Sequence, residues 1–302
     1  MNKVTNRCCK KLTIVQYAKN GFLSVGKPPN SFCYDGYHIT VEDCCIRNTI
    51  IESQTEVEAD DLLSVFALLN KLCMICEGSL LNVKKIYIDD TLMSLDELKE
   101  LLFCSNESDF YGSYLSLISS TTLLSTGLLK KWETLHSEML LPFNAFLYMT
   151  SIKGLPLDIR TAYITECFEP LAYYIEKERP EKISKDNKKN KLFNCLTYII
   201  SIFGEEVFCA EKTAIIQDCR IEQIANNRHR LMHLKSDFNG NLLKDGNEMV
   251  AYSRKLHLLY RHTLLNFMGV NKDKYLQKLI SNVECLDKYM VLNSQNGGAD
   301  DE

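Results

Sequence analysis

The feature that most constrains the fold is a change in the hydrophobic period near residue 110. Before that point, short runs rich in β-branched and aromatic residues, which predict strands, alternate with turn clusters such as 26–30; the clearest runs are 12–17, 37–41 and 83–88. Helices are predicted at 60–76, where acidic residues open an apolar repeat, and at 95–103. Residues 1–110 are therefore expected to form a small α+β domain.

Beyond this point the apolar residues recur at the helical period of 3.6. Breaks fall at glycine, proline and polar clusters, which separate predicted helices at about 128–153, 157–178, 190–209, 212–234, 248–267 and 272–292. Residues 111–292 are expected to form an all-α helical bundle, and 293–302 a disordered acidic tail. The whole chain is thus expected to be of the α+β class.

The composition limits the cellular compartments in which the chain is expected to function. The first residues lack the uninterrupted apolar stretch of a secretory signal, and the uncharged stretch 110–129 carries too many hydroxyl groups to favour a membrane span. The 13 cysteines are odd in number, which favours reduced thiols over a disulfide framework. Cys73 and Cys76 form a CxxC pair that is expected to lie buried in a helix. These features predict a cytoplasmic protein without a membrane segment.

Charge is divided at the same boundary as the hydrophobic period. Residues 1–110 carry a net charge of −5 and residues 111–302 a net charge of +1, which becomes +4 without the three acidic residues of the tail. The overall net charge of −4 is poorly suited to strong non-specific binding of nucleic acid. Any contact with RNA is therefore expected to be confined to a groove of the helical region.

The predicted helix 212–234 contains an unusual arginine. On a helical wheel, Arg228 falls in the middle of an apolar face formed by Ile221, Ile224, Ala225, Leu231 and Met232. A guanidinium there needs a counterpart. The candidates are a carboxylate such as Asp218 or Glu222 or one from another helix, a subunit interface, or an anionic ligand such as phosphate. His229 and His233 lie on the adjoining flank.

The segment 226–233, with the sequence NNRHRLMH, resembles the R-φ-x3-H motif of HEPN ribonuclease domains, and His229 occupies the φ position. A polar loop and another amphipathic helix, ending at 264–270, follow this motif, and the segment 157–171 precedes it. This arrangement resembles the ApeA-type HEPN domains of anti-phage defence proteins over about residues 140–290. The resemblance implies that Arg228, His229 and His233 are catalytic.

The same resemblance implies metal-independent scission of RNA, in which the ribose 2′-OH attacks the adjacent phosphodiester. His233 would move the protons and Arg228 would stabilise the charge on the phosphorane. No metal or other cofactor is expected. Flanking polar residues are expected to contact the RNA; these are Asn227, Arg230 and Lys235.

The resemblance also implies a homodimer, formed through the helical domain, that acts as a defence or toxin effector. The N-terminal domain would then be a sensing portion, and the trigger would come from a phage or from a defence complex.

Other interpretations of the motif remain open. Arg228 can have a purely structural ion pair, and His233 can cap its helix. A degenerate HEPN-like domain can serve as a non-catalytic dimerisation or scaffold subunit of a defence complex. His229 and His233 also have the spacing of a helical zinc half-site, although a third ligand is not evident. Lys235 stands where some HEPN toxins carry a tyrosine that is nucleotidylated, so silencing by that route is not expected.

Overall fold

The computed structural model describes residues 7–17, 28–43, 46–78, 82–94, 116–152, 154–184, 190–211, 214–235, 240–243 and 245–296. The chain divides into two compact units, one of Met1–Glu138 with Ser151–Lys153, the other of Met139–Thr150 with Gly154–Glu302. The predicted helix at 95–103 and the tail residues 297–302 lie outside the described residues.

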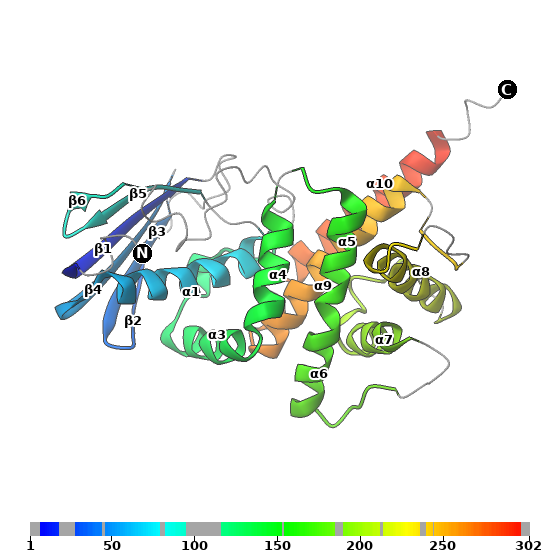
Figure 1. Ribbon diagram of the computed structural model, residues 1–302, viewed down its shortest axis with the longest axis horizontal. Coiled ribbons are helices and arrows are strands. Elements are labelled where there is room, and N and C mark those ends of the chain that lie inside the picture. The colour runs from blue at the N-terminus through cyan, green and yellow to red at the C-terminus, as the bar shows by residue number, and fades with distance from the viewer. Residues whose placement is uncertain are drawn as a thin grey trace. The chain divides into compact units, whose positions relative to one another are not determined.

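The first unit contains an antiparallel sheet in the order β2-β3-β4-β1-β5-β6 (Figure 1). Its strands are β1 Cys8–Tyr17, β2 Asn30–Tyr34, β3 Tyr37–Asp43, β4 Ile46–Glu58, β5 Asn82–Ile88 and β6 Thr91–Leu92. Strands are thus confirmed at 12–17, 37–41 and 83–88. Asp35 and Gly36 join β2 to β3 with φ values of 48° and 81°, as a tight hairpin turn requires.

Helix α1, Ala59–Glu77, packs against β1 and β4, which confirms the helix predicted at 60–76. The alternation of side chains along the strands turns one set of apolar residues inward, and Leu12, Ile14 and Ile51 are completely buried. Their partners on α1 recur at helical spacing and include Leu62, Phe66 and Leu69. Burial of this shared apolar surface holds the α+β unit together.

Helix α3, Thr126–Glu138, belongs to the first unit, so this unit extends past the expected boundary at residue 110. The indole Nε1 of the buried Trp132 donates to the Leu68 carbonyl at 2.9 Å. Before α3, the 3-10 turn η3, Ser120–Thr122, is fixed by the Glu77 carboxylate, which accepts from the Ser120 amide at 3.0 Å. The helix predicted at 128–153 is instead two helices, because the chain leaves the first unit at Met139.

The secondary structure of the second unit is entirely helical among its described residues. It contains α4 Leu140–Ser151, α5 Leu157–Glu166, α6 Phe168–Glu178, α7 Lys191–Phe203, α8 Ala214–Met232, α9 Gly246–Phe267, the 3-10 turn η4 Lys272–Lys274 and α10 Leu276–Asn296. Together with the sheet of the first unit, these helices confirm the α+β class.

Three helix boundaries in the second unit differ from expectation. The stretch 157–178 is two helices that meet at Cys167. Helix α7 ends at Phe203 instead of 209, and the next residue is Gly204, where a Cβ atom would lie 2.7 Å from Ile200. Helix α10 continues to Asn296, so the first residues of the predicted tail are helical.

Helix α9 forms the centre of the second unit, where it packs against α5, α7 and α10. Its Tyr260 is fully buried and stacks on Phe146 of α4 with ring centroids 4.2 Å apart. Its Lys255 is also fully buried and lies 2.7 Å from the Asp287 carboxylate of α10. Helix α8 packs against α5 and α7, and this places it at the edge of the bundle (Figure 1).

Candidate functional site

Helix α8 carries all the candidate residues except Lys235 and His233, which directly follow its last turn. Its buried face agrees with the helical wheel at Ile221, Ile224 and Ala225, each about 1% exposed. The face does not continue to the end of the helix, because Met232 is 38% exposed. The last turn of α8 therefore projects from the bundle. The motif lies at the transition between the buried part of the helix and this exposed last turn.

Arg228 is held by a carboxylate from a neighbouring helix. Its Nε atom donates to Oε2 of Glu166, the last residue of α5, in an ion pair in which the side chains are 19% and 37% exposed. The counterpart is thus on another helix, as one of the open alternatives held, and is neither Asp218 nor Glu222. Within the part of the chain that the structure describes, this is the hydrogen bond that Arg228 makes. Its two terminal amino groups are the donors that remain for an anion.

His233 caps the C-terminal end of α8. The Leu234 amide donates to the Leu231 carbonyl at 3.2 Å and the Lys235 amide to the Arg230 carbonyl at 3.0 Å, while Leu234 takes a left-handed φ of 49°. These two bonds and the left-handed residue define a Schellman motif, with His233 as its C-cap. The His233 imidazole is exposed, so a substrate can reach it.

His229 lies one turn before His233, and their ring centroids are 4.6 Å apart. Burial first, and then the positive charges of Lys235, His233 and Arg228, lower the pKa of His229. The Nζ atom of Lys235 lies 3.1 Å from His229 Nε2, which matches a lysine donating to an unprotonated ring nitrogen. At neutral pH, His229 is therefore a neutral hydrogen-bonding group.

The structure separates the three flanking candidates. Lys235 contacts His229 through its Nζ atom, and Arg230 is exposed two positions after Arg228, at about 200° around the helix. Asn227 is only 6% exposed, and its Nδ2 atom donates to the Gln223 carbonyl at 2.8 Å. The fold thus brings Lys235 to His229, turns Arg230 to another side, and keeps Asn227 inside the bundle.

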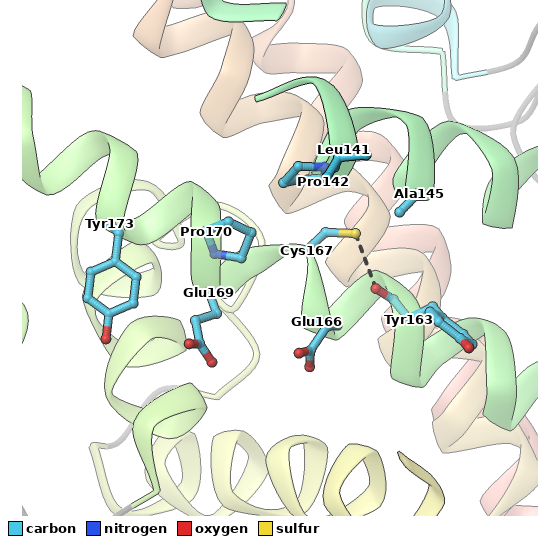
Figure 2. Close-up of a pocket in the computed structure, with 9 residues that line it drawn as sticks. All are labelled: Leu141, Pro142, Ala145, Tyr163, Glu166, Cys167, Glu169, Pro170 and Tyr173. Carbon is cyan, nitrogen blue, oxygen red and sulfur yellow. Dashed lines mark hydrogen bonds between the residues drawn. The ribbon is translucent and has the colours of Figure 1, made fainter. Parts of the chain in front are cut away.

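A pocket of about 420 Å³ adjoins the Arg228–Glu166 ion pair. We call it the α4–α6 groove, since it is lined by α4, α5, α6 and the residue between the last two: Leu141, Pro142, Ala145, Tyr163, Glu166, Cys167, Glu169, Pro170 and Tyr173. Figure 2 shows the carboxylates of Glu166 and Glu169 on one side of the groove and the α4 residues on the other. This groove was not expected from the sequence, because its lining comes from three helices.

The thiol in this groove is not activated. Burial, and secondarily the charge of Glu166, raises the pKa of Cys167 to about 12. Its Sγ donates to the Tyr163 carbonyl at 3.2 Å (Figure 2). Cys167 therefore stays protonated at neutral pH and is no candidate for a thiolate nucleophile.

Among the described residues, no three His, Cys, Asp or Glu side chains are grouped so that they can hold a metal ion. None of the helices in the described ranges is long and apolar enough to cross a membrane.

The comparisons with known proteins agree with the helical fold around this site. The family model described as Apea-like HEPN matches residues 148–274, a range that runs from the end of α4 to η4 and includes the motif on α8. No curated protein and no solved structure matched the chain. The second unit of this protein therefore contains an Apea-like HEPN domain.

Proposed function

We propose that the protein is a metal-independent endoribonuclease of the HEPN type that acts in defence or as a toxin and cleaves RNA as a homodimer. A HEPN domain suggests a nuclease or defence role in general, and such domains commonly dimerise and bind RNA. The observation that carries the proposal is the combination on α8 of an exposed imidazole, His233, with an anchored guanidinium, Arg228.

These two groups supply the chemistry that 2′-OH attack requires. An imidazole can take the proton of the 2′-OH or deliver one to the leaving 5′-oxygen. A guanidinium offers two parallel donors to the nonbridging oxygens as negative charge builds up on the phosphorane. Glu166 holds Arg228 through Nε, and this leaves the two terminal amino groups of the guanidinium as donors for a phosphate. Because the nucleophile is the 2′-OH, DNA is not cut.

The positions of the two groups favour an assembly of two chains. His233 follows Arg228 by five residues, which corresponds to a rise of about 7.5 Å and a rotation of about 140° along a helix. Two side chains so far apart do not converge readily on one phosphate of a single chain. A two-fold axis near the end of α8 would instead bring the arginine of one copy to the histidine of the other.

The test is cleavage of single-stranded RNA by purified protein in EDTA, followed by identification of the fragment ends. We expect 2′,3′-cyclic phosphate ends from the wild type, and a loss of at least about 100-fold in rate for His233→Ala and Arg228→Ala. His38→Ala is the matched control, since His38 is an exposed histidine of β3 in the first unit. Cleavage by His233→Ala at the wild-type rate would show that His233 does not take part in the reaction.

The second candidate is a non-catalytic dimerisation or scaffold subunit. The Arg228–Glu166 ion pair favours it, because a carboxylate that neutralises the arginine is what a purely structural role also requires. Such a protein would form the same dimer and bind no RNA at α8. RNA binding that is weakened by Arg228→Ala would exclude it.

A further inference from the structure

We propose that the α4–α6 groove binds one unpaired base of the RNA, from the nucleotide next to the phosphate held at Arg228. This inference rests on the proposed function and deepens it, because it assigns the groove as a base subsite and names unpaired RNA as the substrate class. Glu166 connects the groove to the candidate catalytic residues, since it lines the groove and also holds Arg228. A phosphate at Arg228 therefore lies beside the groove, and the base of the same nucleotide is the group that can enter it.

The charge of the groove favours a neutral ligand. Its charged lining residues are Glu166 and Glu169, and each is already matched by a cation. Arg228 pairs with Glu166, and the Nζ atom of Lys191 lies 2.6 Å from Oε1 of Glu169. A basic peptide thus finds no excess of negative charge in the groove, and a phosphate finds no excess of positive charge. A nucleobase meets this condition, because it is uncharged at neutral pH.

The walls of the groove suit a flat aromatic ligand. Figure 2 shows two tyrosines, Tyr173 and Tyr163, at opposite ends of the lining, with Pro170 between them. Tyr163 is 38% exposed, and Leu141, on the α4 side, is 80% exposed. Bases of single-stranded nucleic acid stack on aromatic rings of this kind, and this stacking tolerates any base because each has a π-face.

The groove also has the size and the order of a preformed ligand site. Its volume of about 420 Å³ falls within the range of about 300–1,000 Å³ that is typical of small-molecule sites. Besides holding Glu169, Lys191 places its Nζ atom 4.8 Å from the centre of the Tyr173 ring, which restrains that ring. A base that binds to restrained side chains loses less free energy to their ordering.

A base can enter this groove only when it is outside a duplex. In a duplex, each base is stacked on its neighbours and paired along its edge, and proteins recognise the bases of RNA mainly in single strands, loops and bulges. The groove therefore selects unpaired RNA.

The experiment places a fluorescent reporter in the groove. Tyr163→Trp is made in the His233→Ala background, so that the RNA stays intact. Trp132, the chain's own tryptophan, is completely buried in the first unit and gives a constant background. A short single-stranded RNA of mixed sequence should quench the new indole by stacking on it. A ribose-phosphate oligomer of equal length without bases, and the same RNA in a duplex, should leave the fluorescence unchanged.

The second measurement is the dissociation constant of each single-stranded ligand. Tyr163→Ala, in the same background, should weaken binding of the RNA by about fivefold to a hundredfold, as expected for the loss of one stacking contact. Its affinity for the base-free oligomer should be unchanged. Tyr148→Ala is the matched control, since Tyr148 is a tyrosine of α4 that is 53% exposed and is not among the residues that line the groove. It should leave both affinities unchanged.

The base subsite is refuted if the RNA binds without quenching the indole, or if it does not bind at all. It is also refuted if the base-free oligomer quenches equally, or if Tyr163→Ala weakens both ligands by the same factor. Quenching by the RNA together with no cleavage by the wild type would refute the proposed activity alone. Cleavage by the wild type without quenching in the reporter variant would refute the base subsite alone.

Discussion

Arg228 and His233 are held in different ways, and this difference bears on their proposed roles. The guanidinium of Arg228 is tied to Glu166, whereas the imidazole of His233 is exposed at the end of a helix. A group that stabilises charge benefits from being fixed before the reaction, while a group that moves protons must reach both the nucleophile and the leaving group. Glu166 is therefore the residue that sets the charge felt by a phosphate bound at Arg228.

We expect Glu166→Gln to tighten RNA binding by about threefold to tenfold, because it removes a negative charge beside the phosphate and keeps a hydrogen-bond acceptor for Arg228. The dissociation constant is measured in a His233→Ala background, so that the RNA stays intact. Glu169→Gln is the control, since that carboxylate lies in the same groove but pairs with Lys191 at 2.6 Å. Weaker binding by Glu166→Gln would show that its charge is needed to hold the arginine in place.

At the scale of the secondary-structure element, α8 ends in a way that costs folding stability. Leu234 occupies the left-handed position after the cap, where glycine is preferred. We expect Leu234→Gly to raise the free energy of unfolding of the helical unit by about 1 kcal/mol. Chemical denaturation at a protein concentration that keeps the chain monomeric measures this. A loss of stability would mean that the exposed leucine makes contacts within its own chain.

We expect helix α9 to make the helical unit sensitive to acid. Its His262 is 1% exposed, and burial, as the largest cause, lowers its pKa from 6.5 to about 4. Between these two values the unfolded chain binds a proton that the folded chain does not. Stability is therefore lost as the pH falls through this window, at about 1.4 kcal/mol per pH unit for each such group.

We expect His262→Asn to reduce this loss, since asparagine does not titrate and can still bond the Tyr275 hydroxyl, which lies 3.0 Å from His262 Nδ1. Melting temperatures at pH 7 and pH 5 test it. The gap between the two temperatures should be smaller in the variant than in the wild type. An equal gap would mean that other groups account for the acid sensitivity.

The elements show how far the sequence alone could lead. The strands at 12–17 and 37–41, the helix at 60–76 and the buried face of α8 were predicted because each follows from a local period. The partner of Arg228 was not, because Glu166 lies 62 residues away and only the packing of α5 on α8 brings them together. Likewise, no local signal distinguishes a break at Met139 from a continuous helix, since the chain there passes between two compact units.

At the scale of the whole molecule, the central question is whether the active centre belongs to one chain or two. If Arg228 and His233 act across a two-fold interface, a heterodimer of Arg228→Ala and His233→Ala contains one intact centre and one doubly damaged centre. After full exchange, half the dimers are mixed, so an equimolar mixture should recover about one quarter of the wild-type rate. Each variant alone stays inactive. A mixture as inactive as its components would place both groups in one chain.

The measurement that tests the account most directly is the cleavage of single-stranded RNA by the wild-type protein in EDTA. The His233→Ala variant, shown to be folded, is assayed in parallel. The account predicts cutting by the wild type alone, with 2′,3′-cyclic phosphate ends and no cutting of the same sequence as DNA. Equal cutting by both proteins, or cutting that EDTA abolishes, would contradict a metal-independent ribonuclease centred on His233.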